Sequence, residues 1–204
     1  MTAILEVTAA YFLKNQKGRD AKSFYMTPAF ADFKEPTIEI MSLDCGASPA
    51  TLAVDYTADG SGKFPILEWK EPEGIAASVK EWLLVAEDPD APLPTPICHG
   101  LYAGIAPEKT QIGPEDLEIQ DQSQSLLKGG FHYGKNMRGR VYIPPRPLMN
   151  HGVHRYFFQV VALSEPLDKK FLKSSVTREQ IADAIKGKVL GWGMWVGSCE
   201  RKWK

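Results

Sequence analysis

A buried strand that ends in a cluster of carboxylates is the first place in the sequence where chemistry can be expected. The continuous apolar run 83–86 indicates a strand buried on both faces, and it leads directly into Glu87-Asp88-Pro89-Asp90-Ala91-Pro92. The two prolines of this motif lack a backbone N–H and fix φ, so the strand cannot continue through them. His99 follows after a short proline-rich loop. Asp88 and His99 could therefore build a small polar pocket, although a sharp polar turn without a ligand would give the same pattern.

The elements that would position this pocket are mostly short strands. Residues 37–41 and 51–56 alternate apolar and polar side chains, as half-buried strands do. Residues 155–163 are too apolar for an edge strand and indicate a second central one. Further strands are expected at 66–69, 81–86, 101–105 and 189–199. Many short strands separated by proline-marked turns predict a mainly β protein, an antiparallel β-sandwich with peripheral N-terminal and C-terminal helices.

Two helices are expected at the periphery of this sandwich. An amphipathic helix is predicted over about residues 3–15, with its apolar stripe docked on the body of the protein. Thr177-Arg178-Glu179-Gln180 forms a capping box that starts a second helix, which is expected to run to about Lys186. Residues 107–130 are polar and irregular, and we expect a long surface loop there. No linker or repeat divides the chain, so residues 1–204 are expected to form one domain.

Composition excludes several classes of function. The formal net charge of −1 gives no overall attraction to nucleic acid or to an anionic membrane. Three widely spaced cysteines, Cys45, Cys98 and Cys199, indicate neither a disulfide framework nor a metal site, and no cofactor is expected. The sequence shows no apolar run of membrane-spanning length and no secretory signal, which predicts a cytoplasmic protein.

Two separated segments resemble the signatures of a known family. The motif 87–92 with His99 is similar to the first signature of the phosphatidylethanolamine-binding protein family, and Gly152-Val153-His154-Arg155-Tyr156 with Phe158 and 162–163 is similar to the second. Weaker similarity around 59–69 and 197–201 extends the match to about residues 37–201. The resemblance is to the bacterial and fungal type, which includes Raf kinase inhibitor-like proteins.

The resemblance implies a small pocket for an anion at one end of the sandwich. By position, Asp88, His99, His154 and Tyr156 would line it, and Pro89 would be a candidate cis-proline. Two imidazoles and a hydroxyl can donate to a phosphate, a carboxylate or a phospholipid head group, and the carboxylate would orient the imidazoles. Arg155 would point to the opposite face of its strand and serve as a structural ion-pair partner.

Three other side chains near these signatures are expected to be structural. His132 and His151 match neither signature, and both are expected in loops; a place for His151 near the pocket rim stays open. Cys98 adjoins His99 but matches no nucleophile signature, so we expect a small buried apolar side chain.

The sequence departs from the family pattern at the pocket. Gly100 stands where relatives carry a bulky aromatic residue, which leaves either room for a larger ligand or a space filled by a neighbouring side chain. Tyr142-Ile143-Pro144 replaces a glycine-rich stretch, and Pro144 has no N–H to offer an anion. Arg146 could compensate as a charged donor. Gly100, Tyr142 and Arg146 are therefore included among the expected ligand-binding residues.

Three functions are compatible with this pocket. A binding module would hold a small anionic ligand in a shallow pocket and regulate a kinase or a protease. An enzyme, similar to family members implicated in fungal secondary metabolism, would couple maleic-anhydride-type units in a deep cavity that reaches Gly100. In that case His99 or His154 would act as the base and Asp88 would orient it. Protease inhibition through residues 1–20 would instead be independent of the pocket.

Overall fold

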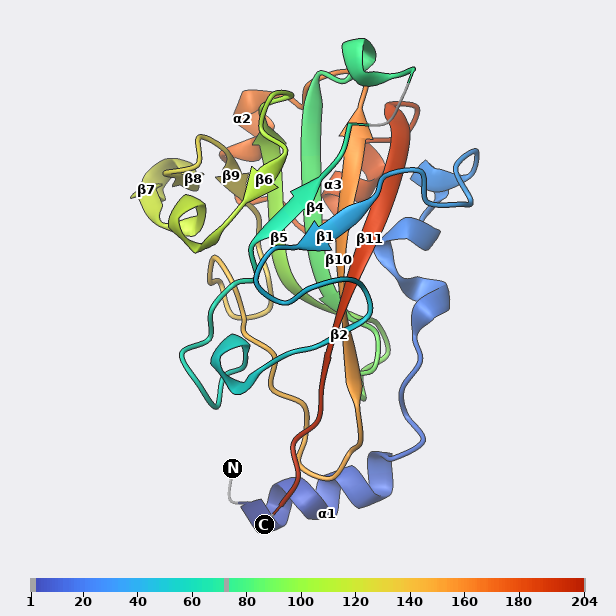
Figure 1. Ribbon diagram of the computed structural model, residues 1–204, viewed down its shortest axis with the longest axis vertical. Coiled ribbons are helices and arrows are strands. Elements are labelled where there is room, and N and C mark those ends of the chain that lie inside the picture. Colours follow the sequence, from blue (N-terminus) through green and yellow to red (C-terminus); the bar gives the residue numbers. More distant parts are fainter. Residues whose placement is uncertain (1–2, 72–73, 204) are drawn as a thin grey trace.

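Two β-sheets stacked on each other form the structure, a computed structural model that describes residues 3–71 and 74–203 (Figure 1). The larger sheet has the strand order β2-β11-β10-β4-β5-β9-β8-β7, and the smaller has the order β1-β3-β6. All pairings are antiparallel except that between β2 and β11. The mainly β, antiparallel sandwich predicted from the sequence is confirmed. The strands are β1 (Ile40–Ser42), β2 (Ala50–Thr51), β3 (Leu67–Trp69), β4 (Glu81–Asp88), β5 (Ile97–Ile105), β6 (Gln111–Ile112), β7 (Ile119–Asp121), β8 (Leu126–Leu127), β9 (His132–Tyr133), β10 (His154–Leu163) and β11 (Val189–Cys199).

Strand β4 is buried on both faces, as its continuous apolar run predicts. Trp82, Leu84 and Ala86 face the core between the two sheets. Leu83 and Val85 face a second core on the other side of the large sheet. That second core is covered by α2 (Lys169–Leu172), α3 (Arg178–Ala184) and residues 24–30, so the strand has no solvated side. Successive side chains of a strand point to opposite faces, so a strand covered on both faces needs apolar residues at every position.

Several short elements differ from the sequence prediction. Residues 54–56 form a 3₁₀ turn instead of continuing a strand from residue 51. The expected loop 107–130 contains three short strands, and His132, expected in a loop, lies in β9. The capping box is confirmed because the Thr177 side chain accepts from the backbone N–H of Gln180 and the Gln180 side chain accepts from that of Thr177. The helix itself ends at Ala184, earlier than predicted.

Helix α1 (Ala3–Leu13) packs in the opposite sense to the prediction. It lies across one end of the sandwich, at the bottom of Figure 1, beside the C-terminal residues. Its buried residues are Glu6 and Ala10, whereas Ile4, Leu5, Tyr11 and Phe12 are exposed, Phe12 at 76%. The reason is electrostatic: the Glu6 carboxylate accepts from Arg146 Nη1 at 2.7 Å and from Arg201 Nη1 at 3.0 Å, and these ion pairs turn the acidic face inward. The expectation of a docked apolar stripe is wrong.

The described helices are all short. None of them, within residues 3–71 and 74–203, is long and apolar enough to cross a membrane.

Candidate functional site

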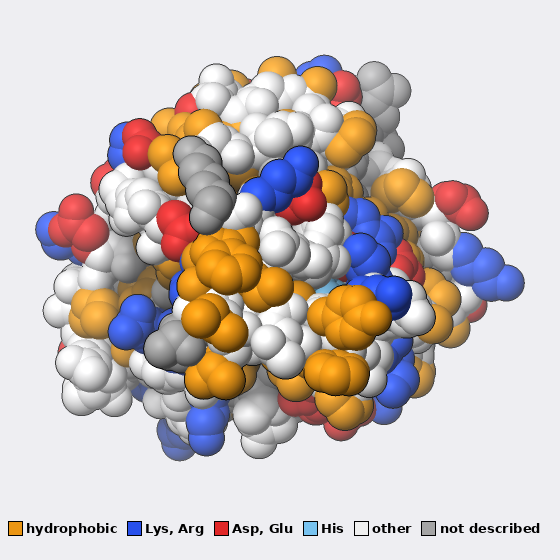
Figure 2. All heavy atoms as spheres, turned by 90° about the horizontal axis from the view of Figure 1, so that it is seen from below, with side chains coloured by type: hydrophobic (Ala, Val, Ile, Leu, Met, Phe, Trp, Pro, Cys, Tyr) orange, Lys and Arg blue, Asp and Glu red, His pale blue; other side chains and the backbone are white. Residues whose placement is uncertain are grey.

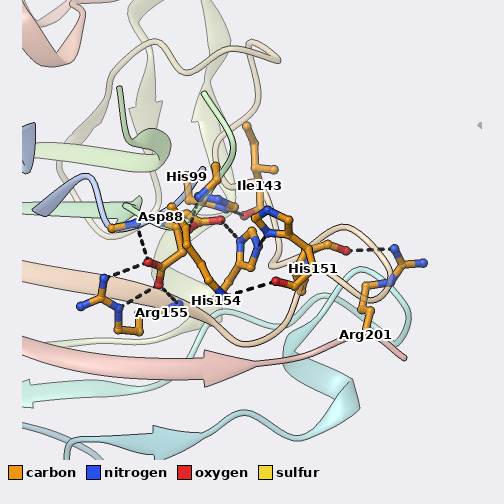
Figure 3. A network of polar contacts seen from close by, with 12 residues as sticks. Asp88, His99, Ile143, His151, His154, Arg155 and Arg201 are labelled. Atoms are coloured by element: carbon orange, nitrogen blue, oxygen red, sulfur yellow. Dashed lines mark hydrogen bonds and ion pairs between the residues drawn. The ribbon is translucent and has the colours of Figure 1, made fainter. Parts of the chain in front are cut away.

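The Asp88 side chain lies at the end of β4, on the face toward the core between the sheets. It is almost fully buried. Its Oδ1 accepts the backbone N–H groups of Asp90, at 2.8 Å, and Ala91, at 3.0 Å. The turn after the strand therefore fixes the carboxylate, and the second oxygen, Oδ2, is left for His154 Nδ1 at 2.9 Å (Figure 3).

Strand β10 brings His154 and Tyr156 to the same face as Asp88. The two side chains lie two positions apart on the strand, so they point in one direction, and both are about 1% exposed. Arg155 points the other way, where its guanidinium bonds Asp90 and Asp20 at 2.8 Å. These hydrogen bonds to Asp90 and Asp20 raise the pKa of Arg155. The prediction of a structural ion pair for Arg155 is confirmed.

A β-bulge turns His99 to the same face of the large sheet as Asp88, His154 and Tyr156. In the pairing of β4 with β5, Ala86 lies opposite Gly100 and Glu87 lies opposite Cys98, so His99 is the extra residue of the register. Without the bulge, His99 would face the second core, as Cys98 does. With it, the His99 ring contacts the Tyr156 ring edge to face, with centroids 5.2 Å apart. His99 and His154 therefore lie close to Asp88, as expected from the resemblance to the two family signatures.

The hydrogen bonds of His99 define its protonation. Its Nδ1 lies 2.5 Å from the Ile143 carbonyl oxygen, which can only accept, so Nδ1 carries the proton. Burial lowers the pKa of His99, which favours the neutral ring with a bare lone pair on Nε2. Among the described residues, neither this Nε2 nor the buried Tyr156 hydroxyl makes a hydrogen bond of normal geometry, and the Cys199 thiol beside the hydroxyl is only a weak partner. Two orphaned polar atoms on touching rings are costly in a core, and a ligand that bonded both would remove that cost.

Sequence reasoning left open whether His151 reaches the site. It is almost fully buried, and its Nδ1 lies 2.7 Å from His154 Nε2 (Figure 3). Its Nε2 lies 2.9 Å from the carbonyl oxygen of Leu13, the last residue of α1. The result is a chain from Asp88 through His154 and His151 to α1. The sequence feature that could have indicated this contact is the short spacing of the two histidines, which lie three positions apart with Gly152 and Val153 between them.

The space next to Gly100 is filled from within the core. A Cβ atom added at Gly100 would lie 2.5 Å from the Tyr102 hydroxyl oxygen, so the Tyr102 side chain occupies this volume. Its hydroxyl donates to the Val141 carbonyl at 3.0 Å, which holds the ring in place. Of the two alternatives that the sequence left open, a neighbouring side chain fills the space. This arrangement favours a shallow pocket over a deep cavity that reaches Gly100.

Three further expected site residues lie around this centre in structural contacts. The Tyr142 ring packs edge to face on Phe64, with centroids 5.0 Å apart. Arg146 pairs with Glu6 of α1, so its expected role as an anion clamp stays a prediction. Pro89 is not a cis-proline, because the cis peptide bond among the described residues is Ser48–Pro49. The carbonyl of Pro89 accepts from the N–H of Arg19, which ties the chain after α1 to the rim of the site.

Neither a nucleophile nor a metal centre emerges from the neighbouring groups. Cys98 packs against the second core, and burial raises the pKa of its thiol to about 12, so it stays protonated at neutral pH. Within the described part of the chain, no group of three or more His, Cys, Asp or Glu side chains has the arrangement of a metal site. The site offers acid–base and hydrogen-bonding chemistry through imidazoles, a carboxylate and a phenol.

A family model described as phosphatidylethanolamine-binding protein matches residues 45–200. The chain belongs to this family. It is 46% identical over 202 residues, 98% of this chain and 82% of the relative, to "Phomoidride biosynthesis cluster protein B" of Talaromyces stipitatus. A protein of the same name from another fungal species is 43% identical over 98% of this chain and 96% of the relative. A solved structure titled as a putative homolog of the family from Chlamydia trachomatis superposes with a TM-score of 0.65, at 22% identity, over 82% of this chain and 99% of that one. This last likeness shows the fold, and the first two cover the site as well.

Proposed function

We propose that this family member binds a small carboxylate-bearing molecule at the site formed by Asp88, His99, His154 and Tyr156. The observation that carries the proposal is the pair of buried polar atoms without partners, His99 Nε2 and the Tyr156 hydroxyl. Buried polar groups in native cores are nearly always hydrogen-bonded, so an unpaired pair on touching rings indicates a place for a bound group.

A carboxyl group fits these two atoms chemically. The Tyr156 hydroxyl donates to one of its oxygens, and the proton shared with His99 Nε2 lies between the ring and the other oxygen. Binding of a carboxylate therefore takes up one proton, because burial lowers the pKa of His99 and favours its neutral ring. Asp88 accepts from His154 Nδ1 and so orients that ring, whose Nε2 lies 2.7 Å from His151 Nδ1 and can contact the ligand only after His151 moves. Regulation of a kinase or a protease, and inhibition through residues 1–20, stay predictions.

Replacing Tyr156 by phenylalanine tests the proposal because it separates binding from stability. Among the described residues the Tyr156 hydroxyl has only the Cys199 thiol as a weak partner, so we expect the free energy of unfolding to change little. We expect the affinity for maleate to fall about tenfold with the loss of one hydrogen bond to a charged group. Isothermal titration calorimetry measures the affinity and urea unfolding the stability.

Tyr102→Phe is the matched control, because it removes another buried hydroxyl, one that has a partner. Loss of its bond to the Val141 carbonyl should cost about 0.5–1.5 kcal/mol of stability and leave the affinity for maleate unchanged. Inorganic phosphate and phosphoethanolamine are titrated alongside maleate, and tighter binding of either would assign the site to phosphate or to a phospholipid head group. Equal maleate affinity of the wild type and Tyr156→Phe would contradict the proposal.

A second candidate function is catalysis in a secondary-metabolite pathway. The two fungal relatives that cover 98% of this chain are named for a phomoidride biosynthesis cluster, which favours this candidate over a regulatory role. On this hypothesis the site couples maleic-anhydride-type units, and the neutral His99, with its free Nε2, is the general base. The proton removed from one unit goes to His99, and Tyr156 stabilises the developing enolate oxygen.

His99→Asn distinguishes the two candidates. The amide preserves a hydrogen-bonding side chain but is no base, so we expect maleate to bind with a loss of about tenfold while turnover of a maleic-anhydride substrate falls by at least about 100-fold. Mass spectrometry of the coupled product measures turnover. Retained turnover in the variant would remove His99 as the base, and absent turnover in the wild type would leave binding as the function.

A further inference from the structure

The site described above is closed by the protein's own chain. His154 has two ring nitrogens, and Asp88 takes Nδ1. The other, Nε2, is the one a ligand would need, and His151 Nδ1 occupies it at 2.7 Å. The two rings are buried with centroids 5.0 Å apart. His151 therefore stands where part of a ligand would lie, and it must move before His154 can bind anything else.

Helix α1 holds His151 in this position. The Leu13 carbonyl at the end of the helix lies 2.9 Å from His151 Nε2, and Lys17 Nζ, just beyond the helix, lies 3.3 Å from the His151 carbonyl. The N–H of Gly18 then donates to Asp90 Oδ1 on the turn that fixes Asp88. Release of the helix C-terminus would free His151, and movement of His151 would free the helix.

The attachment of α1 is suited to reversible release because it is mainly polar. The helix turns Ile4, Leu5, Tyr11 and Phe12 to solvent, so lifting it exposes little additional apolar surface (Figure 2). Its remaining ties are the ion pairs of Glu6 with Arg146 and Arg201 and the contacts of residues 17–19. Figure 2 views this end of the molecule and shows hydrophobic side chains at its surface beside lysine and arginine.

Counting protons shows that the closed chain is sensitive to pH. The Asp88 carboxylate and the Leu13 carbonyl at its two ends can only accept hydrogen bonds. Three hydrogen bonds lie between them, from Asp88 to His154, from His154 to His151 and from His151 to Leu13, and each needs one proton. Two neutral imidazoles supply only two. The closed state thus holds one proton more than a carboxylate and two neutral rings, and losing it leaves one bond without a proton.

We propose that His151 and α1 form a proton-dependent gate over the ligand site. With the extra proton the gate is closed; without it, His151 loses its hydrogen bond to His154 or to Leu13, so the link between the site and α1 is broken and the helix is released more readily. The sign follows from the count: the closed state binds more protons than the open one, so a higher pH favours opening. The inference rests on the proposed function only for what enters the open site.

Burial and the charges around His151 together hold its pKa below the ordinary value for a histidine. Burial lowers the pKa of His151, and the positive charges of His154 and Lys17 act in the same direction, whereas the Leu13 carbonyl and Asp88 raise it. Asp90 is neutralised by Arg155, and Glu6 by Arg146 and Arg201, so these groups add little net charge. The closed state is thus not favoured far above the ordinary histidine range.

Hydrogen–deuterium exchange of residues 3–13 in the full chain tests the gate. After correction for intrinsic chemical exchange, we expect wild-type α1 to exchange at least about tenfold faster at about pH 8 than at about pH 6, on either side of the ordinary histidine pKa. His151→Ala should show fast exchange at both pH values. His132→Ala, which changes a remote histidine bonded to the Gln124 carbonyl, should behave like the wild type.

Glu6→Gln separates loosening of the helix from loss of the switch. It weakens the ion pairs of α1 but leaves the proton count unchanged, so exchange should be faster at both pH values while the ratio between them persists. Exchange of α1 that is independent of pH in the wild type, or identical in the wild type and His151→Ala, would overturn the gate. Neither outcome bears on the maleate titrations with Tyr156→Phe, so failure of the gate and failure of the ligand site are distinguishable.

Discussion

Replacing Arg178 with methionine is expected to lower the free energy of unfolding by about 3–5 kcal/mol. Arg178 Nε donates to Glu87 Oε2 at 2.9 Å, and the Glu87 side chain is completely buried on the face of β4 opposite to the site. Glu87 retains two other partners on its Oε1, the backbone N–H of Phe24 and the amide of Gln159. These are neutral dipoles, so removing the guanidinium leaves a buried carboxylate without a countercharge.

Methionine keeps an apolar side chain but removes the whole guanidinium, whose Cζ lies over the Phe24 ring at 5.6 Å from its centroid, so the loss reports the charged group as a whole. Urea unfolding measures it. Lys70→Met is the control, because Lys70 and Glu39 form an ion pair with both side chains more than 70% exposed, and its loss should cost about 0.5 kcal/mol or less. Similar losses in the two variants would mean that the buried pair contributes no more than a surface pair.

The parts of this site that the sequence predicted follow from local periodicity. The apolar run of β4 requires two covered faces, and residues 154–156 of β10 must alternate between them; both statements need no knowledge of the rest of the fold. Asp88 and His99 could be proposed from the sequence pattern, and the family resemblance added His154 and Tyr156. Periodicity then placed Arg155 on the opposite face from these two, but it would have turned His99 the other way.

The parts that could not be predicted depend on contacts between distant segments. The bulge at His99 exists only in the pairing of β5 with β4, and no residue type in β5 indicates it in advance. The orientation of α1 depends on Glu6 meeting two arginines that lie 140 and 195 positions further along the chain. The pattern of apolar residues in a short helix cannot reveal such partners, so it predicted a docked stripe. The role of His151 likewise depends on the position of the Leu13 carbonyl.

Asp88→Asn is expected to lock the gate closed and to weaken maleate binding by at least about tenfold. The carbonyl oxygen of the new amide can still accept from the N–H groups of Asp90 and Ala91, so the turn is preserved. Its NH₂ group replaces Oδ2 and donates to His154 Nδ1, where the wild-type carboxylate accepts. His154 then carries its single proton on Nε2 and donates to His151 Nδ1, while His151 keeps its own proton on Nε2 and donates to the Leu13 carbonyl.

The three hydrogen bonds of the chain are thus satisfied in Asp88→Asn by two neutral imidazoles, and no extra proton is needed. We expect residues 3–13 to exchange slowly at both about pH 6 and about pH 8, the opposite of His151→Ala. A merely destabilising effect of the substitution would instead accelerate exchange at both pH values, and urea unfolding reports it separately. Exchange in Asp88→Asn that still rises with pH as in the wild type would show that the proton count does not control α1. The double variant Asp88→Asn/His151→Ala should open the helix again at both pH values, because without the His151 ring the hydrogen bond to the Leu13 carbonyl at the end of α1 is lost.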